Sequence, residues 1–140
     1  MNNSYTVFDC NIIHFMKINN RAGNLTSIEN NKDIPFAVKR VYYLYDVPGG
    51  ETRGAHAHIN LEQIVIAASG GFDVTIDDGK NKKTILLNRS YMGLYLKPGM
   101  WRELHNFSSG AICLVLASER YLPEDYLRDY SEFIKYKNII

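Results

Sequence analysis

Turn signals recur at short intervals along this chain, and they constrain its fold more than any other feature. Clusters of Gly, Pro, Asn and Asp occur at 19–24, 29–33, 47–51, 69–71, 77–81 and 97–99. The stretches between them are rich in β-branched and aromatic residues, which predicts strands over 37–46, 61–69, 71–78, 82–88, 92–97 and 111–118. Because no helical periodicity lies between these strands, the pattern indicates an antiparallel sandwich or barrel.

The segment GFDVTIDD at 71–78 shows the strand period most clearly. Phe72, Val74 and Ile76 alternate with polar residues, so they are predicted to share one buried face. The DDG that follows is a hairpin-turn signal.

The C-terminus departs from this β pattern. Pro123 suits the first turn of a helix, and Glu124 and Asp125 complement a helix N-terminus. An apolar stripe follows, made of Tyr126, Tyr130, Phe133 and Ile134. We predict a short amphipathic helix over 123–137 that packs outside the sheet as a lid on the core; a helix that binds a partner protein is the alternative.

The size and charge of the chain exclude several classes of protein. At 140 residues it is predicted to form a single domain, 1–140. A formal net charge of +1 offers no basic field for nucleic acid or a membrane surface. Its longest apolar run, AICLVLA at 111–117, is far shorter than the ~20 residues of a membrane helix. Without a secretory signal pattern, the expected location is the cytoplasm.

The stretch RGAHAHINLEQ at 53–63 carries the strongest chemical signal. On a strand, His56 and His58 point to one side, while Ala55 and Ala57 point to the other. If that shared side is the interior of a barrel, two imidazoles enter one pocket. An unperturbed imidazole has a pKa of about 6.5, so either ring could accept or return a proton near neutral pH.

Two other interpretations of the histidines remain open. Counted from Gly50, the spacing GxxxxxHxHxxxE is similar to the first metal-binding signature of the cupin barrels, with Fe, Mn, Ni or Zn as the candidate metals. Its ligand set would be His56, His58, Glu62 and His105. The two histidines could also simply fill a polar interior, although such a cluster is costly to bury.

Four blocks of sequence together resemble the cupin-type nucleotide-sugar 3,4-ketoisomerases, which act on dTDP-4-keto-6-deoxyglucose. These blocks are IENNKDIPFAVKRVYYLYDV (28–47), RGAHAHINLEQ (53–63), MGLYLKPGMWRELHNF (92–107) and LVLASERYLPEDYLRDYSEF (114–133). The resemblance implies an all-β cupin jelly-roll barrel (double-stranded β-helix) and a homodimer that exchanges N-terminal strands within residues 1–30. It also implies catalysis without a metal or other cofactor.

The resemblance further implies the reaction. Such enzymes move a ketone from C4 to C3 of a dTDP-linked 4-keto-6-deoxyhexose, and an aminotransferase then makes a 3-amino-3,6-dideoxyhexose for lipopolysaccharide or related glycans. Arg102 after Trp101 is typical of relatives whose product has the gluco configuration, but Ala22 matches neither known type. The configuration at C4 therefore stays open.

The chemistry of this reaction assigns roles to particular side chains. Proton transfer through an enediol needs an acid–base pair, for which His56 and His58 are the candidates, with His56 as the base. Arginines fit diphosphate oxygens, tyrosine and tryptophan rings can stack on thymine, and amide or hydroxyl donors can stabilise an enediolate. The predicted substrate-binding residues are Arg40, Tyr42, Arg53, Gln63, Tyr95, Trp101 and Arg102. A nucleotide-sugar-binding barrel without catalytic activity is the alternative from another class of function.

Overall fold

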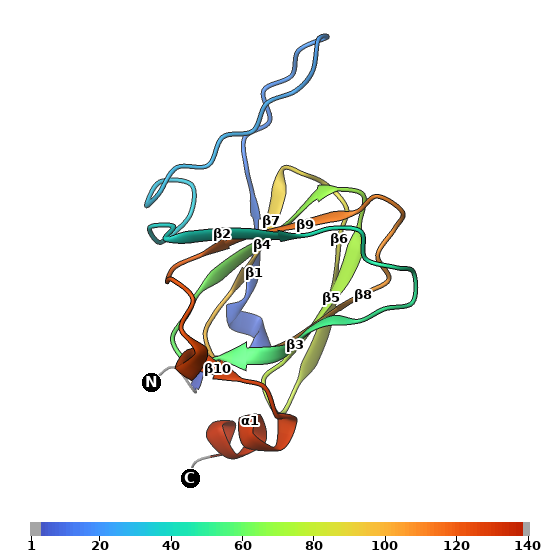
Figure 1. Ribbon diagram of the computed structural model, residues 1–140. Coiled ribbons are helices and arrows are strands. Elements are labelled where there is room, and N and C mark those ends of the chain that lie inside the picture. Colours follow the sequence, from blue (N-terminus) through green and yellow to red (C-terminus); the bar gives the residue numbers. More distant parts are fainter. Residues whose placement is uncertain (1–3, 139–140) are drawn as a thin grey trace.

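The strands assemble into two five-stranded antiparallel sheets that face each other (Figure 1). This computed structural model describes residues 4–138. The first sheet has the order β1 (Asn11–His14), β7 (Met92–Leu96), β4 (Gln63–Ser69), β9 (Ile112–Ala117), β2 (Arg40–Leu44). The second has the order β10 (Tyr126–Leu127), β3 (Arg53–His58), β8 (Trp101–His105), β5 (Phe72–Asp77), β6 (Lys82–Leu87). The predicted all-β jelly-roll barrel is confirmed.

The six strands predicted from composition are all present, with slightly trimmed ends. These six predicted strands do not include β1, β3, β8 or β10. For β8 the reason lies in its sequence, WRELH. Arg102 and Leu104 point into the barrel while Trp101 and Glu103 point outward. A charged residue on the inner face hides the alternation of apolar and polar residues by which a strand is recognised.

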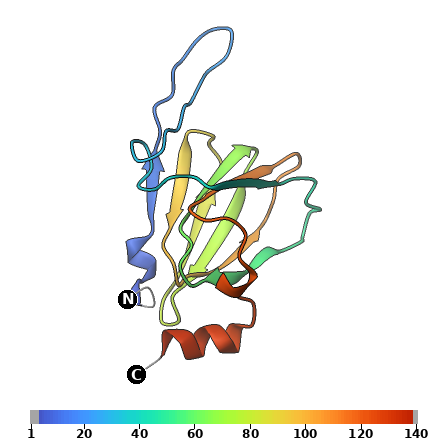
Figure 2. The ribbon, with the colours of Figure 1, turned by 60° about the vertical axis from the view of Figure 1, so that its left-hand side comes forward.

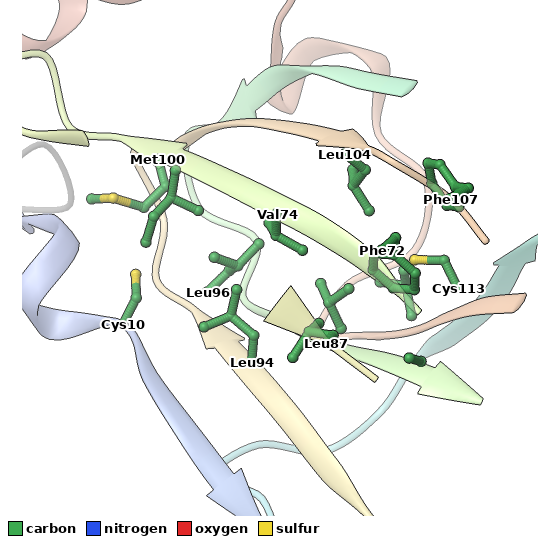
Figure 3. Close-up of a cluster of buried hydrophobic side chains, with 14 of the residues drawn as sticks. Cys10, Phe72, Val74, Leu87, Leu94, Leu96, Met100, Leu104, Phe107 and Cys113 are labelled. Atoms are coloured by element: carbon green, nitrogen blue, oxygen red, sulfur yellow. The ribbon is translucent and has the colours of Figure 1, made fainter. Parts of the chain in front are cut away.

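The core fills part of the space between the sheets (Figure 3). Phe72, Val74 and Ile76 of β5 are fully buried, as their alternation predicts. They pack with Leu94 and Leu96 of β7 and with further apolar side chains of β4 and β9. Phe72 also stacks on Phe107, with ring centroids 5.1 Å apart.

The C-terminal helix α1 spans Tyr130–Lys137, so the predicted start at Pro123 is wrong. Residues Pro123–Asp125 form a 3₁₀ turn, η3, and Tyr126–Leu127 form β10, which pairs with β3. This segment extends the second sheet, which leaves only the residues after Asp129 free to form a helix. The Asp129 side chain caps α1 by accepting hydrogen bonds from the backbone N–H groups of Ser131 and Glu132.

The prediction that this helix packs outside the sheet is confirmed. Phe133 of α1 is fully buried against Ala57 of β3 and Trp101 of β8. In Figures 1 and 2 the helix lies beneath the second sheet, at the end of the molecule opposite the long connection between β1 and β2.

That connection projects beyond the ends of both sheets (Figure 2). It is held together by an antiparallel bridge between Ile18 and Leu25, and it leaves Met16, Ile18 and Leu25 exposed. The exchange of residues 1–30 across a dimer stays a prediction. Within residues 4–138, no helix has the length and apolar character needed to cross a membrane.

Candidate active site

A cavity of about 350 Å³ lies between the two sheets. Part of its wall is apolar, formed by core residues such as Val65, Val74 and Leu96. The remainder is polar and strongly cationic, and it contains Arg40, Tyr42, Arg53, His56, Gln63, Arg102, Tyr121, Tyr126 and Arg128. Four arginines and no carboxylate appear among the described lining residues, so the cavity favours an anionic ligand.

A β-bulge in β3 sets the direction of its side chains. Arg53 pairs with Leu104 and His56 pairs with Arg102, so β3 carries one extra residue between these two pairs. Gly54 lies in the bulge with φ +77°, and a Cβ there would lie 2.5 Å from Leu104 Cδ1. Glycine is therefore needed both for the backbone conformation and for the close approach of β8.

Beyond the bulge, the two histidines point the same way, as predicted. His56 lines the cavity, and His58 lies behind it with 0% of its surface exposed. Their Nε2 atoms are 3.1 Å apart. Ala57, between them, faces outward beneath α1.

Asp125 completes a chain of three titratable side chains that the sequence did not predict. Its Oδ2 lies 3.1 Å from His58 Nδ1, on the side of that ring away from His56. Its carboxylate also accepts hydrogen bonds from the backbone N–H groups of Asn60, at 2.8 Å, and Leu61, at 3.3 Å. Asp125 was interpreted only as an acidic residue of a helix N-terminus.

Arg102 is a buried cation that bonds no carboxylate within residues 4–138. Only 3% of it is exposed, its Nε donates to the Met100 carbonyl at 3.2 Å, and its Nη1 donates to Gln63 Oε1. Its Nη2 is buried without a hydrogen-bond partner among the described residues. A buried cation with a spare donor is costly unless a ligand satisfies it, which makes Arg102 a candidate binding residue.

The contact with Arg102 also orients two neighbouring groups. Because Gln63 Oε1 accepts from Arg102, the Gln63 amide group donates to the Tyr42 hydroxyl oxygen, at 3.1 Å. The hydroxyl proton of Tyr42 is then available for a ligand. Burial raises the pKa of Tyr42, which keeps that proton in place at neutral pH.

Arg40 and three residues of the C-terminal segment form another part of the wall. Nε of Arg40 is buried without a partner within residues 4–138, and its guanidinium lies over the rings of Tyr42 and Tyr121, 5.2 and 5.5 Å from their centroids. Arg128 lies 4.1 Å from the ring centroid of Tyr126. Sequence reasoning missed Tyr121, Tyr126 and Arg128, although the block YLRDY that holds two of them contributed to the family resemblance.

Both histidines of the cavity are held in their neutral form. Burial, followed by repulsion from Arg102, lowers the pKa of His56 from 6.5 to about 2. Burial also lowers the pKa of His58, to about 4, although its hydrogen bond to Asp125 acts in the opposite direction. At pH 7 each ring therefore has one unprotonated nitrogen that can accept a proton.

These shifts predict that the protein loses stability as the pH falls from 6.5 towards 4. In that range the unfolded chain protonates both histidines while the folded protein does not, so protons favour unfolding. Each histidine contributes a slope of up to about 1.4 kcal/mol per pH unit. Urea unfolding between pH 7 and pH 4.5 measures this slope. His56→Asn should reduce the slope by the contribution of one histidine, about 1.4 kcal/mol per pH unit. An equal slope in the variant would contradict the lowered pKa of His56.

Two predicted binding residues, Tyr95 and Trp101, do not line the cavity. Tyr95 alternates with the inward Leu94 and Leu96 on β7, and its hydroxyl donates to Glu62. Trp101 precedes the inward Arg102 on β8 and packs against Phe133 of α1. Strand alternation places each ring on the outer face of its sheet.

The proposed metal-ligand set of His56, His58, Glu62 and His105 is also not brought together. His105 lies on the outer face of β8, with Nε2 2.7 Å from the Thr75 hydroxyl, and Glu62 bonds Tyr95. Among the described residues, no group of three or more His, Cys, Asp or Glu side chains is placed to share a metal ion. The interpretation that used this quartet is therefore wrong.

The family model described as FdtA (WxcM-like, C-terminal) matches residues 8–138. The chain is 46% identical over 125 residues to TDP-4-oxo-6-deoxy-alpha-D-glucose-3,4-oxoisomerase of Aneurinibacillus thermoaerophilus. The matched region covers 89% of this chain and 90% of that relative.

Solved structures agree with this match. The structure of the WlaRB TDP-quinovose 3,4-ketoisomerase from Campylobacter jejuni is 49% identical, with a TM-score of 0.86, over 91% of this chain and 98% of that chain. The structure of QdtA, a sugar 3,4-ketoisomerase from Thermoanaerobacterium thermosaccharolyticum in complex with TDP, is 40% identical, with a TM-score of 0.91, over 93% of this chain and 95% of that chain.

Proposed function

The chain belongs to the FdtA family, and we propose that this sugar 3,4-ketoisomerase converts TDP-4-keto-6-deoxy-D-glucose to the corresponding 3-keto sugar by proton transfer at His56. The observation that carries the mechanism is the composition of the cavity. It combines a neutral imidazole with several arginines, two of which have buried donors without partners among the described residues. In such a site the arginines can bind a diphosphate while the imidazole acts as a base towards the sugar.

The reaction needs no external oxidant, because one carbon is oxidised as its neighbour is reduced. The C4 ketone acidifies the C3–H bond, so His56 removes that proton and the electron pair forms an enediolate across C3 and C4. The proton is returned to C4, and the O3 proton is transferred to O4. The product carries the ketone at C3 and a hydroxyl at C4.

Fixed donors would stabilise the enediolate while it exists. The Tyr42 hydroxyl proton and the free Nη2 of Arg102 both belong to the cavity wall, and neither has to reorganise to meet a developing negative charge. We propose that these two groups, with Gln63 holding Tyr42 in place, contact the sugar oxygens.

The nucleotide part of the substrate would lie against the remaining arginines. Arg40, Arg53 and Arg128 can bind diphosphate oxygens through paired N–H groups. Tyr121 and Tyr126 have ring centroids 5.5 Å apart, and they replace Tyr95 and Trp101 as the aromatic surfaces for thymine.

The chemistry of the product indicates the next reaction. A ketone at C3 is the group that a pyridoxal-phosphate aminotransferase converts to an amine, and we propose that the enzyme supplies 3-amino-3,6-dideoxyhexoses for surface glycans such as lipopolysaccharide. We also propose that it acts as a homodimer and without a cofactor.

The test of this function is a reaction in D₂O followed by proton NMR. With TDP-4-keto-6-deoxyglucose and a sugar 3-aminotransferase, we expect a 3-amino sugar with deuterium at C4, because a proton held on imidazole exchanges with solvent. The coupling constants of H3 and H4 in unlabelled product report the configuration at C4. Binding of TDP without any change in the sugar over hours would instead identify a binding protein without catalytic activity.

A further inference from the structure

The hydrogen bonds around the two histidines leave only one arrangement of their protons. Asp125 accepts two backbone N–H groups, and although burial raises its pKa, the hydrogen bonds from His58 and the backbone outweigh burial and hold the pKa below its ordinary value. The carboxylate is therefore ionised at pH 7 and can only accept. His58 must carry its proton on Nδ1 to donate to Asp125, which leaves its Nε2 unprotonated.

The same logic extends to the cavity-facing ring. The Nε2 atoms of His56 and His58 are 3.1 Å apart, so one proton lies between them. Since the proton of His58 is on Nδ1, the shared proton belongs to His56 Nε2. The unprotonated nitrogen of His56 is then Nδ1.

We infer that Asp125 is a positioning residue that fixes the tautomers of both histidines and thereby makes Nδ1 of His56 the atom that accepts the substrate proton. This inference rests on the proposed function for its catalytic consequence, but not for the placement of the protons.

The arrangement also gives the accepted proton a place to stay. When Nδ1 of His56 takes a proton from C3, its Nε2 proton can move to Nε2 of His58. The resulting His58 imidazolium then donates to Asp125, whose negative charge offsets that of the ring. Return of that proton to Nε2 makes the His56 ring an imidazolium, which can then deliver its Nδ1 proton to C4, so no proton is gained or lost over the cycle.

Asp125 is held firmly enough for this role. Its own N–H donates to the Leu122 carbonyl and its carbonyl accepts from Ile59, while its side chain binds the backbone at Asn60 and Leu61. Within the described residues, it is the only carboxylate in hydrogen-bonding contact with a histidine ring. The charges that face the pair from β2, β8 and the segment after β10 are the cations Arg40, Arg102 and Arg128, which cannot accept a proton from His58.

The first test needs no variant. In ¹⁵N-histidine-labelled protein at pH 7, two-bond and three-bond ¹⁵N–¹H correlations identify the protonated nitrogen of each ring. We expect the proton on Nδ1 in His58 and on Nε2 in His56. A His58 ring with its proton on Nε2 would overturn the inference, whether or not the protein is an isomerase.

The second test is Asp125→Asn. An Asn amide nitrogen at the Oδ2 position donates to His58 Nδ1 and reverses both tautomers, which leaves His56 Nδ1 protonated. In serine proteases the equivalent Asp→Asn change lowers kcat about 10⁴-fold through the wrong tautomer, and we expect a loss of about 10³–10⁴-fold here. The dissociation constant of TDP should change less than about threefold, since the arginines are untouched.

Asp129→Asn is the matched control. This carboxylate lies four residues further along, caps α1 and does not contact the histidines, and Asn is an equally good cap. Its kcat and tautomers should equal those of the wild type. If Asp125→Asn retains a kcat within about fivefold of wild type, the positioning role is wrong. If that variant does not fold, the wild-type tautomers still decide, and an inactive wild type with the expected tautomers would refute only the proposed function.

Discussion

His56→Asn should reduce turnover of TDP-4-keto-6-deoxyglucose by at least about 10²–10⁴-fold, the usual contribution of a positioned acid–base group. Asn keeps a polar side chain of similar size that can still contact His58, but its amide cannot accept a proton at neutral pH. The arginines of the cavity are unchanged, so the dissociation constant of TDP should stay within about threefold of wild type. Single-turnover kinetics and calorimetric titration with TDP measure the two quantities separately.

His105→Asn is the matched control for this variant. His105 lies on the outer face of the second sheet, bonded to Thr75, so its loss should leave turnover within about twofold. A metal site that used all four candidate ligands would lose activity equally in both variants. Turnover above about a tenth of the wild-type value in His56→Asn would remove His56 from the mechanism.

Arg102→Met should abolish most activity without destabilising the fold. Removing one donor to a developing oxyanion typically lowers kcat by about 10²–10³-fold, and the free Nη2 of Arg102 is such a donor. Methionine fills similar space and removes a buried charge that bonds no carboxylate in the part of the chain that the structure describes. Because replacing a buried charge by an apolar side chain is often neutral or stabilising, we expect the free energy of unfolding to stay the same or rise.

Arg89→Met serves as the comparison for this result. Arg89 is exposed in the connection between β6 and β7 and donates to the Asn88 carbonyl, so its replacement should change neither turnover nor stability. A melting temperature that falls by more than about 5 °C in Arg102→Met would mean that Arg102 has a structural role instead. Full activity in that variant would exclude it from the site.

Much of the fold could be predicted from local patterns in the sequence. The alternation around Phe72, Val74 and Ile76 predicted a buried strand face, and the structure buries all three. The spacing of His56 and His58 placed both rings on one side of a strand, which is how they lie. These predictions succeeded because side-chain direction along a strand depends only on the parity of the residue number.

Strand alternation by itself is enough to place the rings of Tyr95 and Trp101 on the outer faces of their sheets. Tyr95 and Trp101 were selected for their chemistry, but each alternates with residues that point into the barrel, so each must point outward. The predicted start of the C-terminal helix at Pro123 was wrong for a different reason. Tyr126 and Leu127 pair with β3, and pairing between segments distant in the sequence cannot be recognised from local sequence patterns.

The sequence alone determined the β architecture, the shared direction of His56 and His58, and a group of arginines suited to a diphosphate. The tertiary structure alone decided that Asp125, which lies 67 residues after His58 in the chain, meets that histidine, and that Arg102 finds no counter-ion among the described residues. The physical reason is that strand periodicity acts between neighbouring residues. The protonation and charge of the site depend instead on burial and on partners that only chain folding brings within a few ångströms.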